Sequence, residues 1–201
     1  YSAGAVYVYV LDNNIWSLQA RLSASDAGTY DLFGSSVDID GDTLIVGAVG
    51  SDSIDENGED APDMGAAYVF SRSGDQWQQD TKIEPEDGIE GDNFGNALSI
   101  VGSRIVVAAS AKDIGLVSNA GKVYSYYHSG SKWLQSQSVS MSPVALDSFF
   151  GSSLDYDGQR LVVGAQSVSD SGAVYVYYRV GSQWEREAII ESMVDREGDN
   201  F

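Results

Sequence analysis

The sequence predicts an all-β protein built from a repeated unit of four antiparallel strands. Three observations support this fold class. The chain repeats itself in a fixed frame, its apolar runs are short and rich in β-branched and aromatic residues, and no apolar stripe with helical spacing competes with them. The 201 residues are 43% hydrophobic and 11% aromatic, which is ample for packed cores.

A glycine, a tryptophan and a phenylalanine define the repeat. Each glycine is followed 12 residues later by a tryptophan, and each tryptophan 17 residues later by a phenylalanine. The landmarks are Gly4, Gly65, Gly121 and Gly172; Trp16, Trp77, Trp133 and Trp184; and Phe33, Phe94, Phe150 and Phe201. All length variation falls in 49–64, 110–120 and 166–171. This pattern indicates one supersecondary unit repeated in space, with insertions at one edge.

The strand-like runs of each unit indicate how the units stack. The run TLIVGA (43–48) and its counterparts RIVVAA and RLVVGA are apolar at successive positions, so both faces of this strand should be covered. The run that follows alternates, with Tyr7 and Tyr9 on one face and Val6 and Val8 on the other. An antiparallel sheet covered on both faces has to stack against neighbours on both sides, as the blades of a propeller do. We therefore predict a β-propeller with four-stranded antiparallel blades.

The phrases FGSSVDIDGDTLIVGA, FGNALSIVGSRIVVAA and FGSSLDYDGQRLVVGA begin at Phe33, Phe94 and Phe150, and each leads to a glycine-led strand and a tryptophan. These phrases resemble the FG-GAP repeat. The resemblance recurs in register and covers essentially the whole chain. This repeat is the blade of the integrin alpha-subunit propeller and of many extracellular proteins. The resemblance implies a location outside the cell or on its surface, and commonly a propeller of seven blades.

The landmarks divide the single segment 1–201 into a half blade at 5–22, blades at 33–83, 94–139 and 150–190, and the start of a further blade at Phe201. About three and a half blades would leave two exposed sheet edges, because closed propellers have roughly 4 to 8 blades. We expect the segment to belong to a larger, about seven-bladed propeller. The remainder would lie in the same polypeptide, or partner chains would cover the edges.

The charge is expected to gather on one face of the propeller. Thirty acidic and 11 basic residues give a net charge of −19, which repels nucleic-acid phosphates and anionic lipid surfaces. Connections between second and third strands and between blades leave on the same face, which we call the loop face. It comprises 23–32, 49–64, 84–93, 110–120, 140–149, 166–171 and 191–200, with 20 of the acidic and two of the basic residues. Either these acids only keep the protein soluble, or they recruit cations or a basic partner.

Two acidic loops on this face are candidate calcium sites, because calcium takes about six to eight oxygen ligands. The candidate ligands are Asp55, Asn57, Glu59 and Asp60 in the first loop, and Glu86, Asp87, Glu90 and Asp92 in the second. Neither loop matches an EF-hand, since the sixth position counted from Asp55 is Asp60 instead of glycine. The alternating acids Asp38 and Asp40 favour a different explanation, a two-residue type I′ turn at Asp40-Gly41, repeated at Asp157-Gly158.

Two further repeated features have a structural and a functional interpretation. Asp31, Asp92 and Asp199 precede a phenylalanine by two residues, with Asp147 one place earlier in the remaining copy, and hydrogen bonds from turn N–H groups explain them best. The repeated tryptophans favour packing between blades over stacking on a sugar.

Catalysis has little support in the sequence. His128 is the only histidine, there is no cysteine, and paired carboxylates occur throughout the acidic loops. No apolar run approaches the roughly 20 residues of a membrane span.

We expect a non-enzymatic extracellular module that mediates adhesion or assembly with a protein partner or a cell-surface or matrix component, without nucleic acid or membrane insertion. The alternative is a carbohydrate-binding, lectin-like propeller with sites between blades.

Overall fold

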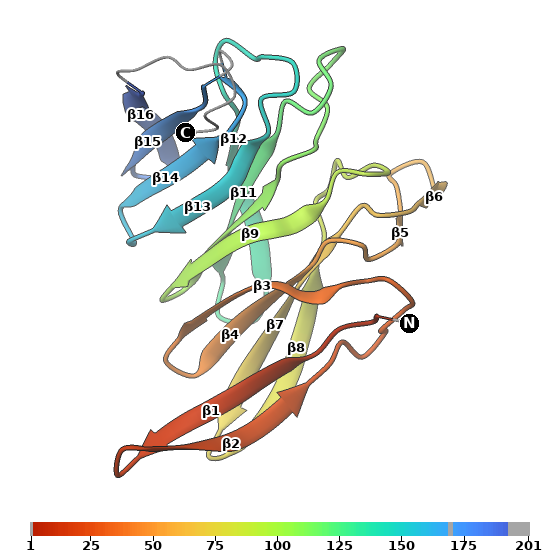
Figure 1. Cartoon of the computed structure of the whole chain (residues 1–201), viewed down its shortest axis with the longest axis vertical. Coiled ribbons are helices and arrows are strands. Elements are labelled where there is room, and N and C mark those ends of the chain that lie inside the picture. The colour runs from red at the N-terminus through yellow and green to blue at the C-terminus, as the bar shows by residue number, and fades with distance from the viewer. Residues whose placement is uncertain (1, 169–170, 193–201) are drawn as a thin grey trace.

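A computed structural model describes residues 2–168 and 171–192 (Figure 1). The described residues contain strands and no helix, and three four-stranded antiparallel sheets follow a two-stranded hairpin in chain order. Figure 1 shows the hairpin and the sheets side by side along an arc, which is not a closed ring. The predicted all-β fold with four-stranded antiparallel blades is confirmed. The predicted start of another blade at Phe201 lies outside the described residues.

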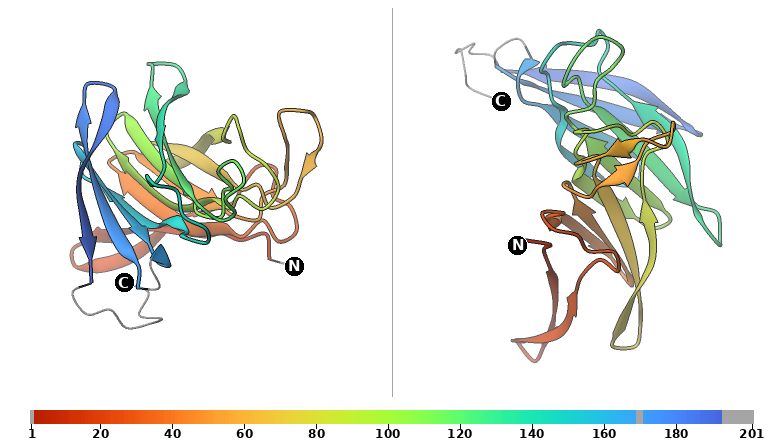
Figure 2. Two further views of the ribbon diagram at one scale, coloured as in Figure 1. Left: turned by 90° about the horizontal axis from the view of Figure 1, so that it is seen from above. Right: turned by 90° about the vertical axis from the view of Figure 1, so that its right-hand side faces the viewer.

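The sheets are named here as blades. The hairpin consists of β1 (Val6–Asp12) and β2 (Ile15–Leu22). Blade 1 comprises β3 (Phe33–Asp40), β4 (Thr43–Ala48), β7 (Ala66–Ser73) and β8 (Gln76–Ile83). Blade 2 comprises β9 (Phe94–Val101), β10 (Arg104–Ala109), β11 (Lys122–His128) and β12 (Trp133–Val139). Blade 3 comprises β13 (Phe150–Tyr156), β14 (Arg160–Ala165), β15 (Ala173–Val180) and β16 (Gln183–Glu191). A small hairpin of β5 (Ser53–Ile54) and β6 (Asp60–Ala61), which the sequence reading did not predict, projects from the loop between β4 and β7 (Figure 2).

The hydrophobic cores lie between the sheets. Along β4, the side chains of Leu44 and Val46 join a cluster with the β1–β2 hairpin, whereas Ile45 joins a cluster with blade 2. A third cluster lies between blades 2 and 3. Five of the six residues of β4 and five of the six of β10 are buried, as the continuous apolar runs predicted. In β14, which has a neighbouring sheet on one side only, Val162 is 37% exposed.

The phenylalanine that opens each blade packs on two aromatic residues of the third strand. Phe94 meets Tyr124 and Tyr126 edge-on, with ring centroids 5.5 and 6.3 Å apart. The corresponding rings of blades 1 and 3 do the same. On the β1–β2 hairpin, Tyr7 and Tyr9 occupy the third-strand positions with no such phenylalanine, and about half of each side chain is exposed.

A backbone junction joins each unit to the next. The N–H of Phe94 donates to the carbonyl of Met64 at 2.9 Å, and Gly65 and Phe94 form an isolated parallel β-bridge. The N–H groups of Phe33 and Phe150 donate in the same way to Ala3 and Ala120. A Cβ atom on Gly4, Gly65 or Gly121 would lie 2.0 to 2.2 Å from the carbonyl oxygen of the facing phenylalanine. The repeated glycine is therefore required by close approach of two backbones.

The predicted type I′ turns are wrong. Asp40 pairs with Thr43, so the central residues of the first turn are Gly41 and Asp42, and of these only Gly41 has a positive φ, at 59°. A positive φ at the first central position alone is the pattern of a type II′ turn. In blade 3 the strand pairing ends at Tyr156 and Leu161, and the carboxylate of Asp157 accepts hydrogen bonds from the N–H groups of Gln159 and Arg160.

We expect Gly65→Ala to destabilise the protein far more than Gly74→Ala. Both glycines have positive φ, so each substitution carries a backbone cost of about 1–2 kcal/mol. A Cβ on Gly74 meets nothing within 4 Å, whereas one on Gly65 would lie 2.2 Å from a carbonyl oxygen and adds about 1–3 kcal/mol of overpacking. Urea unfolding followed by tryptophan fluorescence measures both. Equal losses would show that the junction does not require glycine.

Candidate functional site

The loop face is held together by backbone hydrogen bonds between neighbouring connections. The N–H of Gly50 donates to Asp31 at 3.1 Å, and the N–H of Gly91 donates to Pro62 at 3.0 Å. Further along the arc, Asp147 and Phe149 donate to Ser118 and Asn119. Within the described residues, these bonds join the connections 23–32, 49–64 and 84–93 into one group and 110–120 and 140–149 into another. The side chain of Lys112 links the two groups. In Figure 1 they gather on the side away from the β1–β2 and β3–β4 turns.

The first acidic loop forms the projecting hairpin of β5 and β6. Asp55 Oδ1 accepts from the N–H groups of Asn57 and Glu59 at 2.8 and 2.9 Å. The hydrogen bond from the N–H of Glu59 is the main reason that the pKa of Asp55 is lowered. The carboxylate of Asp55 thus closes the turn, while Glu56, Glu59 and Asp60 are exposed around it.

In the second acidic loop, two carboxylates pair with lysines. Lys112 Nζ donates to Asp92 Oδ2 at 2.8 Å and to the carbonyl of Asp87 at 2.6 Å. Lys122 and the hydroxyl of Tyr124 donate to the two oxygens of the Asp87 carboxylate at 2.6 and 2.7 Å. Asp92 and Lys112 are buried, with 1% and 5% of their surfaces exposed. Glu86 and Glu90 remain exposed.

The pKa values of the two paired aspartates shift in opposite directions. Burial raises the pKa of Asp92, and the ion pair with Lys112 only partly offsets it. Burial also acts to raise the pKa of Asp87, but the hydrogen bonds from Lys122 and Tyr124 outweigh it and the pKa is lowered. The same surroundings, burial first and then the Asp87 carboxylate, raise the pKa of Tyr124.

The candidate calcium ligands are not brought together by the structure. Across residues 2–168 and 171–192, no three acidic or histidine side chains converge as a metal site would require. Asp55 is engaged in its own turn, and Asp87 and Asp92 are paired with lysines. Calcium binding by the exposed acids stays a prediction from the sequence.

The aspartates before the blade-opening phenylalanines cap turns, as predicted for two copies. The N–H of Gly28 donates to Asp31 at 2.6 Å, and that of Ile89 donates to Asp92 at 2.9 Å. In the third copy Asp147 accepts instead from the side-chain amide of Asn119. Asp199 lies outside the described residues.

Asp38 and Asp40 connect blade 1 to blade 2, a role that the sequence reading missed. Asp38 Oδ2 accepts from the hydroxyl of Ser99 at 2.9 Å and from the N–H of Ile100 at 2.8 Å. Asp40 Oδ2 accepts from the N–H of Gly102 at 2.6 Å. Because both aspartates lie on β3, alternate side chains of this strand reach the facing strand β9 and the turn that follows it.

The four repeated tryptophans differ in their surroundings. Trp77 and Trp184 donate their indole N–H groups to Gln19 and Ser125 of the preceding unit, in agreement with packing between blades. Trp16 is 66% exposed. Trp133 is half-buried and lies beside the exposed His128, with ring centroids 5.1 Å apart.

The geometry therefore defines a protein of propeller-like blades that share cores across their interfaces and present their long loops on one face. A comparison with protein families matches the FG-GAP repeat over residues 16–70, 77–126 and 133–177. The chain belongs to the FG-GAP repeat family. A search of curated proteins found no match. No helix in the described part of the chain is long and apolar enough to cross a membrane.

We expect Lys112→Met to cost about 3–5 kcal/mol of stability, because it leaves the carboxylate of Asp92 buried without a countercharge. The double variant Lys112→Met/Asp92→Asn should recover most of the loss, since asparagine is neutral and its oxygen can still accept from Ile89. Lys132→Met, at an exposed lysine, is the control in chemical denaturation. A loss no larger than that of the control would contradict the proposed role of the pair.

Proposed function

We propose that the chain is a non-catalytic β-propeller module of the integrin-alpha kind, which acts outside the cell or on its surface and mediates adhesion or assembly through its loop face. FG-GAP repeats are typical of extracellular and surface proteins. The observation that carries the proposal is the segregation of charge, since 20 of the 30 acidic residues belong to loop-face segments.

The described part of the loop face suits recognition of a basic protein surface. Its connections are tied by backbone hydrogen bonds, so little order has to be gained when a partner binds. Lysine pairs neutralise Asp26, Glu84, Asp87 and Asp92, and they leave the acids of the projecting hairpin unpaired. These exposed acids are Glu56, Glu59 and Asp60. The negative electrostatic field of these exposed acids accelerates the encounter with a cationic partner, and it weakens as salt is added.

Fewer observations support the alternative of a carbohydrate-binding, lectin-like propeller. A lectin with one site per blade would need equivalent sites between the blades. The tryptophans that could form them are bonded to the preceding unit in two copies and exposed in a third. Trp133 lines a cavity between blades 1 and 2, which is a single location and not a site repeated in every blade.

We expect the labelled protein to bind wells coated with purified extracellular matrix proteins, with affinity that falls at least tenfold between about 50 mM and about 500 mM NaCl. Neutralising the hairpin with Glu56→Gln, Glu59→Gln and Asp60→Asn should also weaken binding several-fold. The matched control neutralises three exposed acids elsewhere, with Asp12→Asn, Asp155→Asn and Glu185→Gln. Salt-independent binding, or equal losses in both variants, would count against the loop face.

A further inference from the structure

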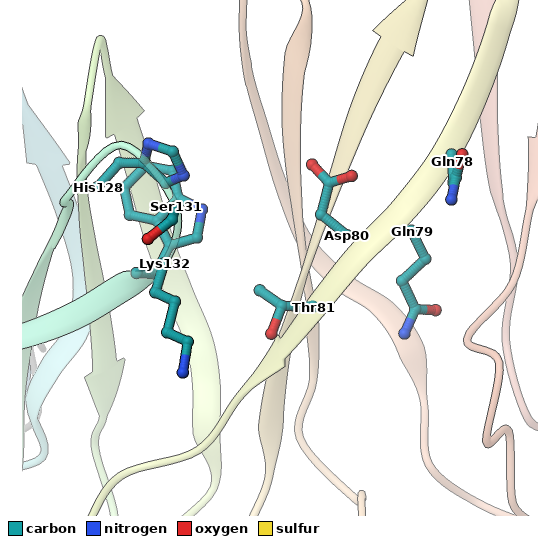
Figure 3. Close-up of a pocket in the computed structure, with 8 residues that line it drawn as sticks. Gln78, Gln79, Asp80, Thr81, His128, Ser131 and Lys132 are labelled. Atoms are coloured by element: carbon teal, nitrogen blue, oxygen red, sulfur yellow. The ribbon is translucent and has the colours of Figure 1, made fainter.

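A groove separates the outer strands of blades 1 and 2. Its largest cavity, of about 650 Å³, lies between β8 and the β11–β12 hairpin, and cavities of about 290 and 210 Å³ continue it. Trp133 lines all three, so they form one groove around this side chain. The largest falls within the ~300–1,000 Å³ that is usual for ligand pockets. In Figure 3, residues of β8 face His128, Ser131 and Lys132 across the open space.

The equivalent positions between the other units are closed by side-chain hydrogen bonds. Between the β1–β2 hairpin and blade 1, Trp77 Nε1 donates to Gln19 Oε1 at 2.8 Å, and Gln79 exchanges hydrogen bonds with Ser25. Between blades 2 and 3, Trp184 Nε1 donates to Ser125 Oγ at 3.3 Å. Among the described residues, no hydrogen bond or ion pair joins 76–83 to 122–139. The middle junction is thus the open one.

Two differences within the repeat explain the opening. At the junction of blades 2 and 3 the acceptor is Ser125, and its counterpart in blade 1 is Val69, which has no polar side-chain atom. Three residues after the tryptophan, the preceding unit carries Gln19 at the first junction and Asp80 at the middle one. The aspartate side chain is one methylene shorter, and its Oδ1 accepts from Ser71 of its own blade at 2.8 Å. Within the described chain, the indole N–H of Trp133 consequently has no acceptor. Because every buried polar side-chain atom described has a partner, this N–H is not buried and can donate to a ligand.

The lining of the groove selects the class of ligand. Asp80 supplies acceptors and Lys132 supplies donors, while Gln78, Thr81 and Ser131 can each do both. The three cavities are lined by both signs of charge, with Asp80, Glu84 and Glu86 beside Lys82 and Lys132, which disfavours polyanions and polycations alike. The polar side chains of the largest cavity disfavour an apolar ligand. Hydroxyl groups, which donate and accept at once, match these walls. The adjacent rings of Trp133 and His128 offer an aromatic surface for the apolar face of a sugar ring.

From this geometry we infer that the groove between blades 1 and 2 binds a neutral oligosaccharide, with the ring and N–H of Trp133 as its centre. The site is distinct from the acidic hairpin of the loop face and does not depend on the function proposed for that face. A glycan held here and a protein held by the loops would be separate ligands.

The test screens the fluorescently labelled protein on an array of neutral glycans and titrates each retained glycan into ¹⁵N-labelled protein. The four indole N–H signals, assigned with tryptophan variants, report where the glycan binds. We expect the Trp133 signal to move and the Trp16 signal to stay. Trp133→Ala should weaken binding at least tenfold, whereas Trp16→Ala, at the same position of the repeat but outside the groove, should leave it unchanged.

A second variant avoids creating a cavity. Asp80→Gln places the longer amide of the first junction opposite Trp133, so it should close the groove and abolish glycan binding while stability is kept or raised. Thermal unfolding confirms that each variant is folded. Retention of no neutral glycan, or equal binding by Trp133→Ala and the unsubstituted protein, would overturn the inference. A shift of the Trp133 signal by an extended peptide with no response to any glycan would also overturn it, in favour of a peptide site.

Discussion

The close approach of glycine and phenylalanine between successive units is the constraint on which the rest of the structure depends. A glycine without a side chain lets the backbone before it accept a hydrogen bond from the phenylalanine that opens the next sheet. That phenylalanine then packs on two aromatic rings of its own sheet. One contact therefore sets the spacing between sheets and places the first ring of each core. The exact recurrence of both residues along the chain follows from this geometry.

Because the cores lie between sheets, each sheet is stabilised through its neighbours. Alternate side chains of one strand contribute to two different clusters, which is the arrangement expected of a repeat protein with nearest-neighbour coupling. The polar contacts between sheets follow the same plan, since Asp38 and Asp40 of one blade satisfy N–H and hydroxyl groups of the next. Opening the interface between blades 1 and 2 would expose apolar surface and unpaired carboxylates together.

The sequence predicted the features that recur and missed those that depend on a neighbour in space. The glycine, tryptophan and phenylalanine landmarks were sufficient for the sheets and for the face on which the long loops lie. The sequence pattern predicts the turn at Gly41 one residue too early, and it gives no sign that Asp38 and Asp40 have partners about 60 residues away. The pairing of Lys112 with Asp92 and the different surroundings of four identical tryptophans required knowledge of which residues face each other. No local pattern carries that information.

The base of the β5–β6 hairpin has a consequence for how this surface can change. The N–H of Gly65 donates to the carbonyl of Ser51 at 3.0 Å, and the N–H of Ser51 donates to Ala48 at 3.1 Å, so the two ends of the insertion are already joined below the hairpin. The entropy of closing such a loop grows only slowly with its length. Residues of the hairpin from Ile54 to Asp60 can therefore be exchanged, lengthened or removed without disturbing the sheets, whereas Pro62 and Met64 accept hydrogen bonds from the next connection and have to stay. Loops that recognise different partners can therefore vary at this position while the sheets stay the same.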